Sequence, residues 1–132
     1  MGDPVDFYRR GVKLLIPLIY RIKYQGFENI PETGPAILIS NHVSFMDGVV
    51  IDSACKRPVR FVIDEHIFNV PGVKYFMQQY GAIRILPNRQ AVERALKDVS
   101  TALRRGDLVC LFPEGQITYT GNMARFRFGI EW

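Results

Sequence analysis

Two side chains capable of proton transfer directly follow an apolar run. His42 and Asp47 lie five positions apart in NHVSFMD (Asn41 to Asp47), after the run AILIS. A carboxylate that accepts a hydrogen bond from one imidazole nitrogen fixes the tautomer, so the other nitrogen is free to accept a proton. The pair therefore predicts a general base oriented by a carboxylate. The alternative is that Asp47 only caps a helix and His42 is an ordinary loop residue.

The spacing of this pair requires a turn between its members. Residues five apart on a regular helix lie about 140° around the axis, so their side chains do not face each other. Ser44 and Asp47 match the S-x-x-D pattern of a capping box. We expect Ser44 at the N-cap of a helix, Asp47 at N3 and His42 in the preceding loop.

Short apolar runs alternate with helical patterns, which predicts an α/β fold with a single, mostly parallel sheet flanked by helices. AILIS has the continuous apolar character of a strand buried on both faces. YRIKYQGF (residues 20–27) alternates as an edge strand does. The other expected elements are the strands RPVRFVID, AIRIL and DLVCLF and helices within VVIDSAC, NVPGVKYFMQQYG and RQAVERALKDVSTALRR, the last ending before Gly106 at C′.

Polar clusters begin where three of these strands end. AILIS runs into NHVSFMD, RFVID into EH, and DLVCLF into PEGQIT. Ligand sites of open α/β sheets lie beyond the carboxyl ends of the strands. We therefore expect His42, Asp47, Glu114 and Gly115 to line one cleft.

Size and composition indicate one folded domain with anionic partners. The chain has 132 residues, 48% of them hydrophobic, and a net charge of +4, so a disordered chain is excluded. The charge favours phosphates, acidic headgroups, nucleic acid or an acidic protein, and a mildly basic soluble domain is the plainer interpretation. Cys55 and Cys110 lack metal-type spacing, and Cys110 in LVCLF is expected to be buried.

The first segment predicts a basic amphipathic helix from about Val5 to Leu18, within an N-terminal unit of residues 1–19. A helix of this kind lies in a membrane interface. The alternative is a helix that packs on the domain and keeps its charges in water. The apolar stretch VKLLIPLIY is interrupted by Pro17 and is far shorter than the roughly 20 residues of a span. The basic residues in and after this helix are Arg9, Arg10, Lys13, Arg21 and Lys23.

Two further patterns invite other functions. Asp64, Glu65 and His66 resemble a metal cluster, but the chain has only two histidines and no H-E-x-x-H, so we expect no metal site. ARFRFG interleaves arginine with phenylalanine as nucleic-acid grooves do. A half-buried strand with a basic face is the better interpretation, and no nucleic-acid partner is expected.

The motifs together resemble the glycerophospholipid acyltransferase superfamily, typified by 1-acylglycerol-3-phosphate acyltransferases. That family's N-H-x-S-x-x-D, G-[AG]-I-x-[IV] and F-P-E-G blocks read here NHVSFMD, GAIRI (Gly81 to Ile85) and FPEG (Phe112 to Gly115). With the lead-in YQGFENIP, the resemblance covers about residues 20–129. NHVSF-x-DG, FPEG-x-IT-x-TG and F-R-x-G-I are most similar to a bacterial branch that includes 2-acylglycerophosphoethanolamine acyltransferases, whose domains are often fused to others in larger proteins.

The resemblance implies a reaction and a set of site residues. His42, oriented by Asp47, would take the proton from the free glycerol hydroxyl of a lysophospholipid, which attacks an acyl thioester of coenzyme A or acyl carrier protein. Glu114 and Gly115 would help bind the acceptor's glycerol and phosphate, and Arg84 would contact phosphate unless it is simply a solvated arginine. Ser44 would be structural rather than nucleophilic. The candidate substrate-binding residues are Asn41, Ser44, Arg84, Phe112, Pro113, Glu114 and Gly115.

The resemblance also implies a setting for this reaction. No cofactor is expected besides the thioester donor. The protein would be cytoplasmic and peripheral at the inner face of the cell membrane.

Two departures from the family pattern matter. Lysophosphatidate-acylating members often read FPEGTRS, whereas FPEGQIT has Ile117 in place of that arginine. This favours a phosphodiester acceptor such as lysophosphatidylethanolamine, unless Arg84, Arg125 or Arg127 compensates. The family's later V-P-V-like strand is absent, so we expect an acyltransferase domain over residues 20–132 that lacks its C-terminal part. Two other functions stay open: a non-catalytic module that binds lipid or acyl carrier protein, and a hydrolase of acyl thioesters.

Overall fold

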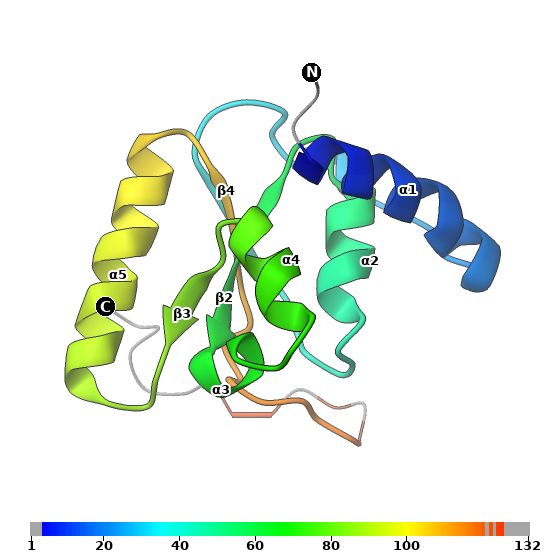
Figure 1. Cartoon of the computed structure of the whole chain (residues 1–132). Coiled ribbons are helices and arrows are strands. Elements are labelled where there is room, and N and C mark those ends of the chain that lie inside the picture. Colours follow the sequence, from blue (N-terminus) through cyan, green and yellow to red (C-terminus); the bar gives the residue numbers. More distant parts are fainter. Residues whose placement is uncertain (1–3, 121, 123, 126–132) are drawn as a thin grey trace.

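The chain forms a parallel sheet between two layers of helices (Figure 1). The computed structural model describes residues 4–120, 122, 124 and 125. Its strands are β1 (Ala36–Ile39), β2 (Val59–Asp64), β3 (Ile83–Ile85) and β4 (Leu108–Leu111). Its helices are α1 (Pro4–Ile19), α2 (Asp47–Ala54), α3 (Glu65–Phe68), α4 (Val73–Gln79) and α5 (Arg89–Arg104), with a 3₁₀ turn η1 (Phe27–Asn29).

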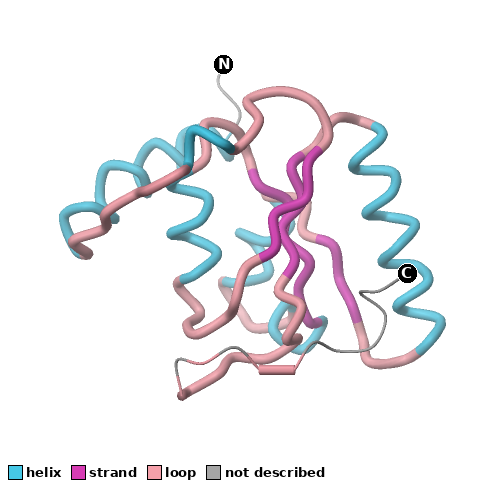
Figure 2. Tube along the Cα trace, turned by 180° about the vertical axis from the view of Figure 1, so that it is seen from behind, coloured by secondary structure: helices cyan, strands magenta, loops and turns pink. Residues whose placement is uncertain are grey.

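The sheet has the strand order β1-β4-β2-β3, and every pairing is parallel. Leu108 at the start of β4 is opposite both Ala36 of β1 and Val59 of β2, so these strands begin level with one another. The loops that follow the strands consequently gather at one edge of the sheet, the lower edge in Figure 2. The predicted α/β fold with a parallel sheet is confirmed.

The core lies on both faces of the sheet because successive strand residues point to opposite faces. Leu108 and Cys110 pack with Val59 and Phe61 on the face that α2 covers, and both Leu108 and Cys110 are fully buried. Val109 packs on the other face, with Ile83 of β3 and two alanines of α5. Burial of Cys110, which the sequence predicted, is confirmed.

Helix α5 has clear capping residues at both ends and a regular buried face. The Asn88 side chain accepts a hydrogen bond from the N–H of Ala91 at 2.8 Å, which caps the helix start. Gly106 follows the C-cap with φ of 86°, a backbone conformation that favours glycine. Ala91, Ala95 and Ala102 form the buried stripe, and their small side chains let the helix lie close to the sheet.

The expectation that the AILIS strand is buried on both faces is wrong. β1 is an edge strand, and Ile37 and Ile39 are 46% and 63% exposed. Ala36 and Leu38 point to the α2 side and join the core there. On the opposite face α5 packs over β3 and β4, so it leaves the β1 side chains on that face open.

The edge strand expected at residues 20–27 does not form either. This segment is an extended loop that ends in η1, after Gly26 with φ of 72°. Its attachment to the domain runs through a side chain, because the Tyr24 hydroxyl hydrogen-bonds the Ser53 hydroxyl of α2 at 2.8 Å. Alternating polarity therefore reflects side-chain contacts here and not a ladder of backbone hydrogen bonds.

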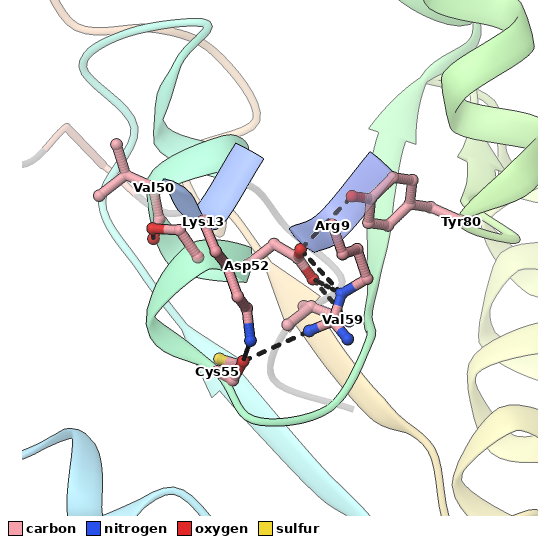
Figure 3. Close-up of polar contacts among 8 residues, drawn as sticks. Arg9, Lys13, Val50, Asp52, Cys55, Val59 and Tyr80 are labelled. Carbon is pink, nitrogen blue, oxygen red and sulfur yellow. Dashed lines mark hydrogen bonds and ion pairs between the residues drawn. The ribbon is translucent and has the colours of Figure 1, made fainter. Parts of the chain in front are cut away.

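Helix α1 is fastened to α2 by a buried ion pair (Figure 3). Arg9 Nε lies 3.0 Å from Asp52 Oδ2, and the two residues are only 6% and 2% exposed. Arg9 Nη2 and Lys13 Nζ both donate to the carbonyl of Cys55 at the end of α2. Both sequence interpretations left the basic residues of α1 in contact with water or headgroups, and for Arg9 both are wrong.

Candidate active site

The structure pairs His42 with Asp47 at the carboxyl edge of the sheet. His42 lies in the loop after β1 and Asp47 is the first residue of α2. Nδ1 of His42 is 3.0 Å from Oδ2 of Asp47. A carboxylate oxygen accepts hydrogen bonds, so Nδ1 carries the proton and the lone pair is on Nε2. None of the residues that the structure describes hydrogen-bonds to Nε2.

The local turn differs from the predicted capping box. α2 begins at Asp47 with Met46 at the N-cap, so Ser44 lies before the helix and is not its N-cap. Ser44 Oγ accepts from the N–H of Met46 at 3.1 Å, and the N–H groups of Val43 and Ser44 both donate to Asp47 Oδ2. Because a tight turn replaces the first helical turn, Asp47 can reach back to His42.

The FPEG stretch after β4 packs directly against His42. The ring of Phe112 stacks on the imidazole with centroids 4.2 Å apart. Pro113 and Glu114 are buried, and Glu114 Oε1 accepts from the backbone N–H of His42 at 3.1 Å. Gly115 has φ of 62°, and its N–H donates to the Phe112 carbonyl, closing a turn that favours glycine. The structure thus brings His42, Asp47, Glu114 and Gly115 together.

Thr118 is a site residue that the sequence analysis missed. Its N–H and its Oγ1 donate to the carbonyl oxygen of His42 at 2.8 and 3.3 Å. A threonine in a loop has no periodic pattern, so the only signal was its place in the stretch FPEGQIT.

His42 lines a cavity of about 1690 Å³ whose other walls are mostly apolar. Side chains from α4 and α5 contribute, among them Phe76, Met77, Leu96 and Val99. Phe112, Pro113 and Gly115 also line this cavity. Asp47 and Glu114 do not, so the expectation that these two line one cleft with His42 and Gly115 is wrong. The cationic residues that line it are Arg89, Arg104 and Arg125.

The remaining candidate residues lie apart from this cluster. Arg84 is exposed, its guanidinium lies 4.9 Å from the ring centroid of Phe68, and it does not line the cavity. Asn41 is exposed and also outside the cavity lining. Their roles in binding substrate stay predictions. Arg127 and most of the ARFRFG stretch lie outside the described residues.

The other reactive groups have structural surroundings. Asp64 caps α3, since its Oδ1 accepts from the N–H of His66 at 2.8 Å. Within the described ranges no group of three or more His, Cys, Asp or Glu residues is arranged to bind a metal ion. Burial raises the pKa of the Cys110 thiol to about 12, and chiefly burial also raises the pKa of the Cys55 thiol. Neither thiol is set up as a nucleophile.

The chain is similar to known acyltransferases. Residues 21–131 match the family model described as Acyltransferase. Over 113 residues the chain is 32% identical to the chloroplastic 1-acyl-sn-glycerol-3-phosphate acyltransferase LPAT1 of Arabidopsis thaliana, covering 83% of this chain and 31% of that protein. It is 23% identical over 128 residues to the 1-acyl-sn-glycerol-3-phosphate acyltransferase of Borreliella burgdorferi, covering 95% of this chain and 47% of that protein.

A solved structure shares the fold. The crystal structure of the 1-acyl-sn-glycerophosphate acyltransferase PlsC from Thermotoga maritima superimposes with a TM-score of 0.71 at 22% identity, over 94% of this chain and 51% of that one. The chain thus spans between about a third and a half of these proteins. Since the family model matches residues 21–131 and the motif resemblance agrees with it, the chain belongs to the acyltransferase family of the glycerophospholipid acyltransferase superfamily.

Proposed function

We propose that this domain transfers a fatty acyl group from an acyl thioester to the free glycerol hydroxyl of a lysophospholipid. The observation that carries the proposal is that His42, hydrogen-bonded to Asp47, lines a large, mostly apolar cavity. The pair supplies a base whose acceptor nitrogen is hydrogen-bonded by none of the described residues. The cavity supplies apolar walls suited to an acyl chain.

In the proposed reaction Nε2 of His42 removes the hydroxyl proton as the hydroxyl oxygen attacks the thioester carbonyl. The new C–O bond forms and the C–S bond breaks. The imidazolium then returns its proton to the departing thiolate, so a free thiol and an ester are the products. Asp47 keeps the proton on Nδ1 and stabilises the imidazolium while it exists. No acyl-enzyme is required.

Recognition of the acceptor phosphate falls to arginines in this proposal. Arg125 lines the cavity, and a guanidinium presents a planar fork to oxyanions. Arg84 is the second candidate, although reaching the cavity would require it to leave the ring of Phe68. Ile117 offers no such contact, which favours a phosphodiester headgroup over a phosphomonoester.

We further propose that the domain works at a membrane surface, peripheral to the inner face of the cell membrane, with acyl-coenzyme A or acyl carrier protein as donor and no other cofactor. Phe7, Leu14 and Leu18 of α1 are 78%, 71% and 78% exposed. Apolar side chains presented by a basic helix suit a lipid interface. No described helix combines the length and the hydropathy of a membrane span.

The test is thiol release from palmitoyl-coenzyme A and from palmitoyl-acyl carrier protein, with and without lysophosphatidylethanolamine or lysophosphatidate. We expect release that requires a lysolipid and is abolished in His42→Ala. The matched control is His66→Ala, which removes the other histidine of the chain and should retain activity. Release without any lysolipid would indicate a hydrolase. Vesicle binding by a folded chain without any thiol release would favour a non-catalytic module.

A further inference from the structure

Both backbone polar groups of His42 are bound by the stretch that follows β4. The N–H donates to Glu114 Oε1 at 3.1 Å, and the carbonyl accepts from the N–H and Oγ1 of Thr118 at 2.8 and 3.3 Å. These partners are 72 and 76 positions away along the chain. A loop residue usually has its backbone in water, so this double attachment needs an explanation.

The carboxylate of Glu114 has no oxygen left without a partner. Oε1 accepts from His42, and Oε2 accepts from the N–H of Ala124 at 2.7 Å. Glu114 is 1% exposed and does not line the cavity in which His42 takes part. A hydroxyl bound in the cavity would therefore not reach this carboxylate unless the buried side chain moved, which would leave its backbone donors unsatisfied.

Four contacts hold the ring and the backbone of His42. Asp47 binds Nδ1, Phe112 stacks on the ring face, Glu114 binds the N–H and Thr118 binds the carbonyl. Nε2 alone is left without a hydrogen bond from the described residues. General-base catalysis depends on such positioning, since a displacement of about 1 Å costs on the order of 100-fold in rate.

We propose that Glu114 and Thr118 are positioning residues that fix the backbone of the base His42, and that Glu114 does not contact the acceptor. The second oxygen of Glu114 extends the same effect to Ala124, whose neighbour Arg125 lines the cavity. One carboxylate therefore sets both the base and the arginine proposed for phosphate. The effect on turnover rests on the proposed acyltransferase function, whereas the effect on His42 itself does not.

The kinetic test compares Glu114→Gln, Thr118→Val and Thr118→Ser with the unchanged protein. The glutamine faces two N–H donors with only one oxygen, so we expect kcat to fall on the order of 10- to 100-fold while KM for the lysolipid stays within about twofold. Thr118→Val removes one of two bonds to the carbonyl, so kcat should fall about threefold to tenfold, and Thr118→Ser should restore it. Glu28→Gln and Thr101→Val, both at exposed positions, are the matched controls and should change neither constant.

The spectroscopic test needs no turnover. In ¹H–¹⁵N spectra of the folded chain, Glu114→Gln should move the His42 amide resonance upfield and speed its hydrogen exchange, and Thr118→Val should perturb the same loop. The thermal midpoint of each variant separates these local changes from general loss of structure. If the unchanged protein were inactive while the variants showed these shifts, the acyltransferase proposal would be wrong and the positioning role would stand.

Two results would overturn the positioning role. One is a rise of tenfold or more in the lysolipid KM of Glu114→Gln with kcat preserved, because it would mean that Glu114 contacts the acceptor. The other is an unchanged His42 amide resonance in both Glu114→Gln and Thr118→Val, because the hydrogen bonds would then not fix this residue.

Discussion

A single carboxylate oxygen organises the base. Oδ2 of Asp47 accepts from Nδ1 of His42 and from the N–H groups of Val43 and Ser44, at 3.0, 2.7 and 2.8 Å. The same atom therefore shapes the loop and sets the tautomer. An asparagine at position 47 would not fix the tautomer reliably, since its amide can present a donor to Nδ1 as well as an acceptor.

Replacing Asp47 with Asn should separate these two effects. We expect kcat to fall on the order of 1000-fold, because the proton on Nδ1 is no longer fixed. Stability should fall by about 1 kcal/mol, because hydrogen bonds to a charged oxygen are replaced by weaker bonds to a neutral amide oxygen. Thiol release and urea unfolding measure the two quantities, with the exposed Asp98→Asn as control. Turnover at the native rate in Asp47→Asn would contradict the assigned role of the carboxylate.

For single residues, the sequence predicted the His42–Asp47 pair but not the hydrogen bonds that other residues make around it. His42 and Asp47 carry recognisable chemistry, and their spacing demands the turn that the structure contains. Thr118 acts on a backbone carbonyl through a contact between distant loops, which no local pattern encodes. The capping box was predicted on residue types alone, yet Ser44 bonds to the N–H two residues ahead and the helix starts later.

Helix α2 links the base to helix α1. Its first residue, Asp47, binds His42, and Asp52 near its other end forms the buried ion pair with Arg9. Asp52 also accepts from the Val59 N–H of β2 and the Tyr80 hydroxyl after α4, at 3.2 and 3.4 Å. Several elements thus meet at one carboxylate, as Figure 3 shows.

Removing the arginine should therefore destabilise the whole domain. We expect Arg9→Met to lower the free energy of unfolding by about 3–5 kcal/mol, because Asp52 becomes an unpaired buried charge. Arg9→Met combined with Asp52→Asn should regain part of this loss, since the charge is gone. Urea denaturation measures the difference, and the exposed Arg10→Met is the control. Equal stability of the Arg9 and Arg10 variants would show that the ion pair contributes nothing.

The same carboxylate makes the protein sensitive to alkali. Burial, reinforced by the negative charge of Asp52, raises the pKa of Tyr80 to about 12, against about 10 for an exposed tyrosine. The folded chain keeps the hydroxyl protonated where the unfolded chain ionises it, so this stability is complete below pH 10 and is lost as the pH rises towards 12.

In Tyr80→Phe this loss should vanish. The stability advantage of the native chain over Tyr80→Phe should shrink between pH 10 and pH 12, measured by urea unfolding at fixed ionic strength. The buried thiols are present in both proteins, so their own alkaline ionisation cancels in the comparison. A difference that stays constant over this range would mean that Tyr80 titrates normally.

Secondary-structure elements were predictable from the sequence where the hydrophobic periodicity and the capping residues agreed. Helix α5 has both a helical apolar repeat and caps from Asn88 and Gly106, and it lies where expected. Residues 20–27 offered alternation alone, and tertiary contacts of Tyr24 decided their conformation. The position of β1 at the sheet edge depends on the strand order, which no single segment contains.

Charge and apolar surface combine at the scale of the whole molecule. The chain carries a net charge of +4, and the sequence placed much of it on the N-terminal helix. The structure moves Arg9 into the interior and leaves Phe7, Leu14 and Leu18 largely exposed. Burial of the apolar side chains, more than attraction of Arg9 to headgroups, should therefore dominate binding to a membrane.

This balance predicts how binding to vesicles should respond to substitution and to salt. Burying a leucine side chain contributes about 1.5–3 kcal/mol, so Leu14→Ser combined with Leu18→Ser should weaken binding to vesicles containing phosphatidylglycerol on the order of 100-fold. The exposed Tyr119→Ser, after β4, is the control and should bind as the native chain does. Raising the salt concentration should weaken native binding less than the double substitution does, because screening acts only on the charges that remain exposed. Cosedimentation with vesicles measures all three. If salt abolished binding while the double variant bound normally, the interface would be electrostatic and the apolar face of α1 would have another partner.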